Sequence, residues 1–212
     1  ASLLFAPAAA THLVNALLAL LMVAGLIDFS RRYFSHGTGL LATLLFLYLA
    51  RNQIDTAYVD LGLALFAFYA FYAAVEWLRS GRTMYVIVAA FLLAIAAGIK
   101  YQGLLLLPTF ALALLAVNRN PATWMRITLV LLCVGTWWYA WNWLQSGDPI
   151  HPFGGPWFGY WLWDAADLQG QKGDLLRFTG HLPWFLAPAL LFPFLPRRRS
   201  PAERMLLVLG LA

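Results

Sequence analysis

Apolar residues run along this chain in long stretches, separated by short clusters of arginine, aspartate, glycine and proline. Stretches of about 17 or more apolar residues with few charges are typical of helices that cross a membrane. The alternating pattern of a membrane β-barrel is absent, because runs of leucine, alanine and phenylalanine dominate. The pattern predicts eight helical segments, at about Thr11–Ile27, Gly37–Ala50 with an extension toward Ile54, Ala57–Leu78, Met84–Ile99, Tyr101–Val117, Ile127–Leu144, His181–Pro196 and from about Met205 onward.

The fourth and fifth segments are separated by one lysine. Lys100 is the only charged residue among the 34 residues from Met84 to Val117. A single helix over that stretch would be about 51 Å long, whereas the hydrocarbon core of a membrane is about 30 Å thick. We therefore expect a helical hairpin with Lys100 at its tip, between Gly98 and Gly103.

The composition agrees with a membrane protein. Hydrophobic residues make up 62% of the chain and charged residues 11%, and the mean hydropathy is +0.72. A soluble domain carries about 25% charged residues. The predicted fold class is all-α, a polytopic bundle of transmembrane helices with a long, aromatic-rich outer loop at about residues 145–180. The single cysteine, Cys133, excludes a disulfide within the chain.

The basic residues divide unevenly between the two sets of loops. Arginine-rich loops stay in the cytoplasm, so this division predicts that the arginine-rich loops are cytoplasmic and that the aspartate-bearing loops face outward. The net charge of +5 is explained by arginines that hold loops on the cytoplasmic side, and it does not indicate binding of nucleic acid. We therefore expect membrane lipids, and no nucleic acid, as partners. The expected outer loops hold four basic residues (Arg51, Lys100, Lys172 and Arg177) and six of the nine acidic ones, and the expected cytoplasmic loops hold ten of the fourteen basic residues, Arg31, Arg32, Arg79, Arg82, Arg119, Arg126, Arg197, Arg198, Arg199 and Arg204.

Polar residues on the expected outer side are the candidates for chemistry. Lys100 lies in a short apolar turn, where it can meet an anionic group at headgroup level, such as a polyprenyl phosphate, or simply mark a helix end. Arg51, Asp55, Tyr58 and Asp60 lie between the second and third segments. Asp60 opens an apolar helix, where the helix dipole favours a carboxylate. A carboxylate and an arginine there could also bind a sugar hydroxyl, a metal or a phosphate, and the residues alone leave the choice open.

The sixth segment leads into the aromatic outer loop. Eight of the ten tryptophans lie between Trp137 and Trp184. Asn142 stands in a row of aromatic residues, and Asp148 and His151 follow in the turn SGDPIHP. The rings suit the faces of sugars, and an interfacial aromatic belt or a loop helix accounts for them equally well. No metal-ligand spacing and no nucleotide-binding motif is present, so we expect chemistry at the membrane with a lipid-linked donor, and a divalent metal ion is the one cofactor left open.

Four stretches carry a further pattern. They are HLVNALLALLMVAGLIDFSRRYF, AYVDLGLALFAFY, AAGIKYQGLLLLP and WYAWNWLQSGDPIHPF, which together extend over roughly Leu13 to Phe153. Their order resembles the bacterial membrane glycosyltransferases of the GT-C superfamily, relatives of the protein O-mannosyltransferases and the lipid A aminoarabinose transferase. The resemblance implies an enzyme of the bacterial inner membrane. It would transfer a sugar from a polyprenyl-phosphate donor to a lipid, glycan or protein acceptor on the outer, periplasmic or extracellular face.

The resemblance also implies roles for individual residues. Tyr58 and Asp60 match a Tyr-x-Asp at the outer start of a helix, and Lys100 matches a turn that contacts the donor phosphate. Ile99 stands before this lysine where the family often has threonine. The substrate-binding candidates are Lys100, Arg51, Tyr58, Tyr101, Asn142, Asp148 and His151, of which Asn142 and Asp148 match an Asn-x(4)-Gly-Asn-Pro stretch with aspartate in place of the second asparagine.

The base of such an enzyme is an acidic residue in the first outer loop. The chain lacks an initiator methionine and stops in an apolar run, so we expect residues 1–212 to be an internal part of one transmembrane domain. The first helix, the first outer loop and the C-terminal part would lie beyond it. The catalytic base is then expected upstream of Ala1, with Asp60 and Asp55 as the candidates inside the chain.

Two other functions stay open. In a carrier or flippase, Lys100, Asp60 and Arg51 would line a path through the membrane. The absence of a convincing internal repeat and the position of the charges at one face favour the enzyme. A non-catalytic membrane subunit is the third possibility, because the expected base lies outside the chain.

Overall fold

The computed structural model describes residues 2–54, 59–115, 118–159 and 164–179. This part of the chain is built of helices and contains no strand, which confirms the all-α class for these residues. The elements are α1 (Ser2–Tyr33), α2 (His36–Ile54), α3 (Asp60–Ser80), α4 (Thr83–Ile99), α5 (Gln102–Leu115), α6 (Pro121–Val130), the π-helical turn η1 (Leu131–Gly135), α7 (Trp137–Ser146), α8 (Gly155–Phe158) and α9 (Ala165–Thr179).

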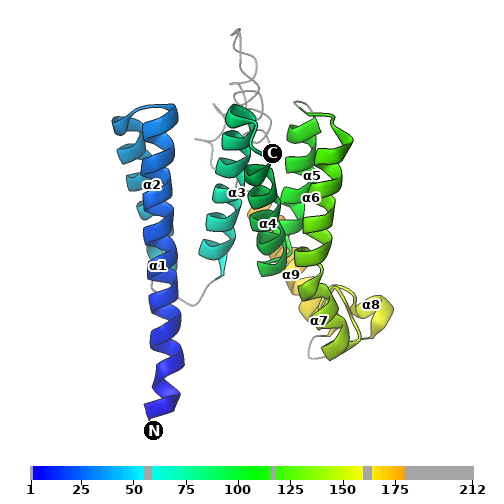
Figure 1. Ribbon diagram of the computed structural model, residues 1–212. Helices are drawn as coiled ribbons and strands as arrows, with labels where there is room; N and C mark the ends of the chain where they lie inside the picture. The colour runs from blue at the N-terminus through cyan, green and yellow to red at the C-terminus, as the bar shows by residue number, and fades with distance from the viewer. Residues whose placement is uncertain (1, 55–58, 116–117, 160–163, 180–212) are drawn as a thin grey trace.

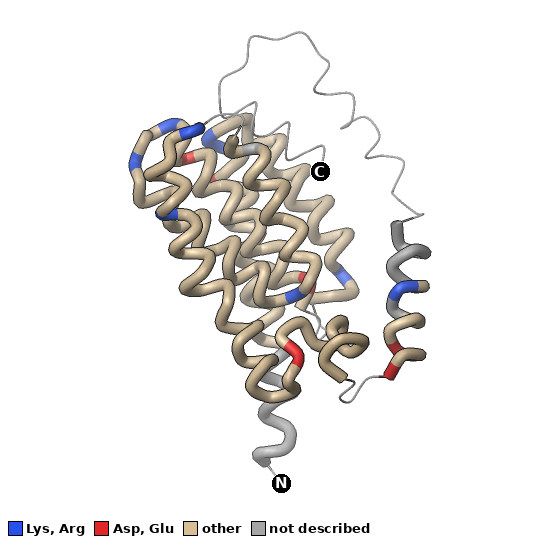
Figure 2. The backbone as a smooth tube through the Cα atoms, turned by 90° about the vertical axis from the view of Figure 1, so that its right-hand side faces the viewer, with Lys and Arg blue, Asp and Glu red and all other residues tan. Residues whose placement is uncertain are grey.

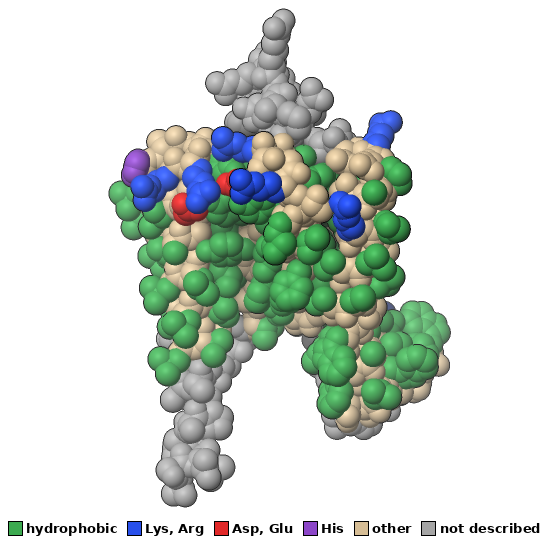
Figure 3. All heavy atoms as spheres, in the orientation of Figure 1, with side chains coloured by type: hydrophobic (Ala, Val, Ile, Leu, Met, Phe, Trp, Pro, Cys, Tyr) green, Lys and Arg blue, Asp and Glu red, His purple; other side chains and the backbone are tan. Residues whose placement is uncertain are grey.

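Successive helices from α1 to α6 run antiparallel, so the connections collect at two ends (Figure 1). The Lys100 end, as we call it, holds the C-terminal end of α2, the start of α3, the α4–α5 turn and α7. Basic residues gather at the other end (Figure 2), and in Figure 3 their side chains lie above a broad apolar surface. This basic end is formed by the α1–α2, α3–α4 and α5–α6 connections, with Arg31, Arg32, Arg79, Arg82, Arg119 and Arg126.

Small residues hold the centre of the bundle together. Alanines allow two helix backbones to approach closely, which is how helices pack inside membranes. The contact between α3 and α4 is lined by such residues, and α5 closes it with an aromatic ring. The buried residues of this cluster are Ala70, Ala73, Ala74, Ala89, Leu93 and Phe110.

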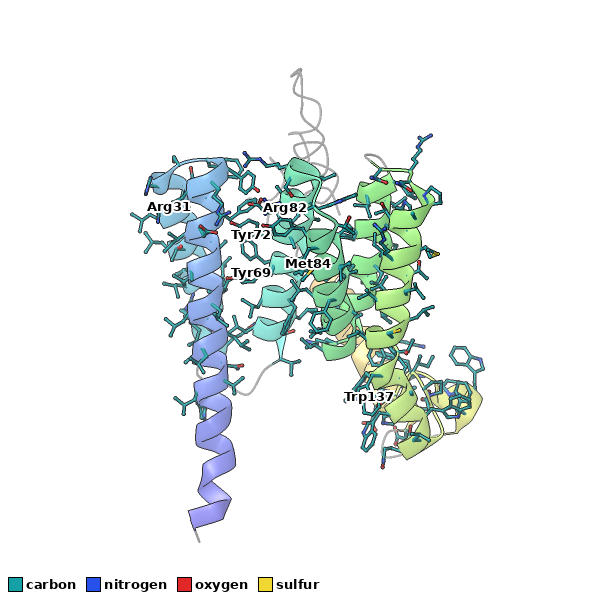
Figure 4. The ribbon with its side chains drawn as sticks, viewed as in Figure 1. Arg31, Tyr69, Tyr72, Arg82, Met84 and Trp137 are labelled. Carbon is teal, nitrogen blue, oxygen red and sulfur yellow. The ribbon has the colours of Figure 1, made fainter. Side chains whose placement is uncertain are left out.

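Aromatic and polar side chains join α1 to α3 near the basic end. Phe29 of α1 meets the ring of Tyr72 edge-on, with the ring centroids 5.1 Å apart. The Tyr72 hydroxyl donates to Asp28 Oδ2 at 2.5 Å, and the Tyr69 hydroxyl donates to the Leu21 carbonyl at 2.9 Å. Figure 4 shows both tyrosines between α3 and α1. These contacts hold the α1–α2 pair against the α3–α4 pair.

Large apolar side chains remain exposed around the bundle. Within the part of the chain that the structure describes, three helices are long and apolar enough to cross a membrane, His12–Tyr33, Asp60–Ser80 and Pro121–Ser146. In water such a surface would promote association, whereas lipid tails match it. Exposed members include Leu13, Leu17, Leu20, Leu40, Leu41, Leu44, Met125 and Leu129.

The predicted helix ends agree with the structure at several places. The second segment reaches Ile54 and the fourth ends at Ile99, as expected. The first helix is longer than the predicted segment Thr11–Ile27, since α1 extends over Ser2–Tyr33. The sixth segment begins earlier, since Asn120 caps it by accepting from the Ala122 N–H at 3.0 Å. Three of the described helices are long and apolar enough to be candidate spans, and the segments expected at His181–Pro196 and from Met205 lie outside the described residues.

The stretch expected as an outer loop contains two helices. Gly147 ends α7 in the left-handed conformation, with φ of 72°, and the short helix α8 follows. Helix α9 then covers Ala165–Thr179. The apolar pattern did not predict α9 because this helix is largely polar, so no apolar run marks it. Trp157 lies on α8, while Tyr160, Trp161 and Trp163 lie outside the described residues.

Candidate functional site

Lys100 occupies the tip of the hairpin between α4 and α5. Its backbone is extended, with φ of −156°, and it separates the end of α4 from the start of α5. The Lys100 carbonyl accepts from the Gly103 N–H at 2.8 Å. A Cβ at Gly103 would lie 2.8 Å from the Cα of Ala97, so the two helices meet here with no room for a side chain. The expected hairpin, with the lysine at its tip, is confirmed.

The Lys100 ammonium is paired with a carboxylate from another helix. Its Nζ lies 2.5 Å from Oδ1 of Asp60, the first residue of α3. The Lys100 and Asp60 side chains are 35% and 36% exposed, so an incoming anion can reach both. The pair places one cation and one carboxylate together at the Lys100 end.

Tyr101 connects this turn to the loop after α7. Its hydroxyl donates to the carbonyl of His151, and its ring meets Phe153 edge-on with centroids 4.8 Å apart. Burial raises the pKa of the Tyr101 phenol to about 12, and nearby Tyr139 and Asp148 add to the rise. A hydrogen bond with the Asn142 side chain lowers the pKa of Tyr101 and so offsets part of this rise. Tyr101 is therefore a neutral hydrogen-bond donor at physiological pH.

Asp148 is fully buried in the α7–α8 loop. Its Oδ1 accepts from the Ile150 N–H at 2.9 Å, whereas no hydrogen-bond donor among the described residues reaches Oδ2. The nearest basic group is Nδ1 of His151, 4.0 Å from Oδ2. A Cβ at Gly154 would lie 2.5 Å from Asp148 Cγ, so only glycine leaves room for this carboxylate. A buried carboxylate with an unsatisfied oxygen is costly, and such groups often mark functional sites.

The structure thus brings together most of the predicted site residues that it describes. Tyr101, Asn142, Asp148 and His151 form one cluster. Lys100 directly precedes Tyr101 in the sequence and is paired with Asp60 of α3. Arg51 instead contacts its own helix, where it donates to the Tyr48 carbonyl at 2.7 Å and lies over the Tyr48 ring.

Two of the predicted residues, Asp55 and Tyr58, lie outside the described residues. Within the described part, no group of three or more histidine, cysteine, aspartate or glutamate residues is placed to hold a metal ion. The open possibility of a divalent cofactor therefore gains no support from these side chains.

A polar network at the basic end was missed by the sequence analysis. Arg32 of α1 lies 3.0 Å from Asp28 and 3.3 Å from Glu76 of α3, and the Tyr33 hydroxyl donates to Glu76 at 2.9 Å. The spacing of Asp28 and Arg32 and the lone Glu76 in an apolar helix were the available signals. Its members neutralise one another, and the network joins the first and third helices.

The described residues form a helical protein in which some helices are long and apolar enough to cross a membrane, with a polar cluster at one end. The chain belongs to the family of DUF8201, a domain of unknown function, whose family model matches residues 1–167. An uncharacterized protein of Shigella flexneri is similar, with 38% identity over 64 residues. The match covers 30% of this chain and 35% of that relative's length. No solved structure gives a significant match.

Proposed function

We propose that this chain is part of a membrane glycosyltransferase that takes a sugar from a polyprenyl-phosphate donor. The acceptor would be a lipid, a glycan or a protein at the outer face of the bacterial inner membrane. The proposal includes the eight-segment topology with the basic end in the cytoplasm. Its main support is the accessible ammonium of Lys100, held at the end of the bundle opposite the basic end.

The proposed chemistry uses that ammonium on the leaving group. A general base takes the proton of the acceptor hydroxyl while its oxygen attacks the anomeric carbon; the bond from that carbon to the phosphate oxygen breaks, and the electron pair stays on the phosphate. Lys100 stabilises the developing negative charge, which is a common source of catalysis in phosphate chemistry. Asp60 orients the ammonium in the free protein through the ion pair at 2.5 Å.

Lys100→Ala in the full-length protein tests the proposal. A hydrogen bond to a charged group contributes roughly 1.5–3 kcal/mol, so we expect binding of undecaprenyl phosphate to weaken by about ten- to a hundredfold. The matched control is Lys172→Ala, which removes the exposed lysine of α9 and is expected to leave binding unchanged. Binding is measured in detergent or nanodiscs, and turnover is followed as the undecaprenyl phosphate released from undecaprenyl-phosphate hexose or pentose donors.

Two results would overturn the proposal. Equal affinity in the wild type and Lys100→Ala would remove Lys100 from the site. Binding without release of undecaprenyl phosphate, in the presence of a lipid extract from the source membrane, would favour a carrier or a non-catalytic subunit instead.

A further inference from the structure

Arg126 is a charged residue inside a helix that is apolar enough to cross a membrane. It is the sixth residue of α6 and lies within the candidate span Pro121–Ser146. At a rise of about 1.5 Å per residue, its Cα lies roughly 8 Å along the helix from the start at the basic end. So close to the end of a span, the long side chain of an arginine extends to the level of the lipid headgroups.

The Arg126 guanidinium has no carboxylate partner among the residues that the structure describes. Its Nη1 lies 3.5 Å from the neutral Thr83 hydroxyl, at the start of α4. Arg32 of the first span is different, because it lies 3.0 Å from Asp28 and 3.3 Å from Glu76. The described part of the protein therefore neutralises Arg32 but leaves the charge of Arg126 for an anion from outside.

Arg82 adds a second positive charge beside Arg126. It directly precedes Thr83, the residue that the Arg126 side chain reaches, and it is exposed at the basic end (Figure 4). In the described ranges it makes no ion pair either. Val86 of α4 and Ile127 of α6 belong to one buried core, which fixes the two helices relative to each other. The two arginines thus stand on a rigid base.

The surface next to the two arginines is apolar. Met84 follows Thr83 in the chain and Met125 precedes Arg126, and these methionines are 67% and 61% exposed. A free phosphate ion gains nothing from such a surface, whereas the acyl chains of a phospholipid match it. Two cations beside exposed apolar side chains therefore fit a phospholipid better than a soluble anion.

We infer that Arg82 and Arg126 bind the phosphate of an anionic phospholipid in the leaflet at the basic end. Guanidinium groups bind phosphate oxygens through paired N–H donors, and basic sites between membrane helices hold lipid headgroups in this way. A headgroup with a net negative charge is required, because the choline of a zwitterionic lipid brings its own cation. The site lies at the end of the bundle opposite Lys100, so it is independent of the proposed sugar transfer.

Lipid binding to the full-length protein in detergent tests the site. The probe is dioleoyl phosphatidylglycerol, and dioleoyl phosphatidylcholine is the zwitterionic reference. One arginine near a membrane surface contributes about fivefold to binding of an anionic lipid, so Arg126→Gln should raise the Kd for the probe about fivefold. Arg82→Gln/Arg126→Gln should raise it further. Both side chains are exposed, so the variants should unfold at the wild-type temperature when no probe is added.

The matched control is Arg31→Gln. It removes the same charge from an exposed arginine of the basic end, but one that interacts electrostatically with Asp28, so the Kd should stay within about twofold. An equal loss in Arg31→Gln and Arg126→Gln would overturn the assignment, because it would show a general attraction to the basic end.

Two further results would also overturn it. Competition by millimolar inorganic phosphate would indicate a site for a soluble anion, and equal wild-type affinity for the two lipids would mean that no anionic lipid neutralises Arg126. Loss of binding confined to the Arg82 and Arg126 variants would support the site, whatever Lys100→Ala does to donor binding.

Discussion

At the scale of single residues, the ion pair between Lys100 and Asp60 controls how strongly an anion can bind at the Lys100 end. The two side chains are about equally exposed, and their charges cancel when no ligand is bound. A phosphate must therefore compete with Asp60 for the ammonium, and Asp60 also repels it.

Asp60→Asn is expected to strengthen binding of undecaprenyl phosphate severalfold. The cost in stability should stay below about 1 kcal/mol, because partly exposed ion pairs contribute little. The measurements are the Kd in nanodiscs and the thermal unfolding temperature. Asp164→Asn is the control, since it removes a charge before α9 and asparagine caps a helix as well as aspartate. Weaker phosphate binding in Asp60→Asn would show that Asp60 helps to hold the ligand.

The sequence predicted the place of these residues better than their contacts. The alternating helices implied that Lys100 and Asp60 share one end, but 40 residues separate them and no local pattern shows that they touch. Asp148 was a candidate because of its motif, whereas its burial depends on Gly154 and on the fold of the α7–α8 loop. Such tertiary facts have no signature in a single sequence.

At the scale of elements, the α4–α5 hairpin depends on close backbone contact. A Cβ at Gly103 would lie 2.8 Å from the Cα of Ala97, and backbone atoms cannot move aside as a flexible side chain can. A Cβ at Gly98 would meet the Trp138 Cβ at 3.7 Å, an ordinary contact. Gly98 can therefore be replaced by a residue with a Cβ, whereas Gly103 cannot without a shift of the backbone.

Gly103→Ala is expected to destabilise the protein by about 1–3 kcal/mol, the usual cost of overpacking. Gly98→Ala should be neutral or stabilising, because alanine favours a helix over glycine by about 1 kcal/mol. Thermal unfolding in detergent, followed by helical circular dichroism, measures both changes. A stable Gly103→Ala variant would mean that the hairpin is looser than the structure shows.

Helix length was the strongest guide to the elements. The 34-residue apolar run had to fold back because no membrane is thick enough for it, and α4 and α5 do so. The π-helical turn η1 was not predictable, since an apolar run gives no sign of an extra residue in one turn. Helix α9 was missed for the opposite reason, because it has no apolar run at all.

At the scale of the whole molecule, the proposed orientation rests on charge and apolar surface together. Lysine and arginine side chains gather at the basic end, and exposed hydrophobic side chains cover the surface below it (Figure 3). Arginine-rich connections remain on the cytoplasmic side during insertion. The Lys100 end, with α8 and α9, would then face outward.

Cysteine labelling in intact cells tests this orientation. In a background without other reactive cysteines, in which Cys133, the one cysteine of these 212 residues, is changed to alanine, Lys172→Cys on α9 should react with a membrane-impermeant maleimide. Arg119→Cys, exposed in the α5–α6 connection, should react only after the membrane is permeabilised. Both sites are solvent-exposed, so a difference in labelling reports the membrane and not burial. The reverse pattern would place Lys100 in the cytoplasm, where free nucleotide sugars are available, and the argument for a lipid-linked donor would then fail.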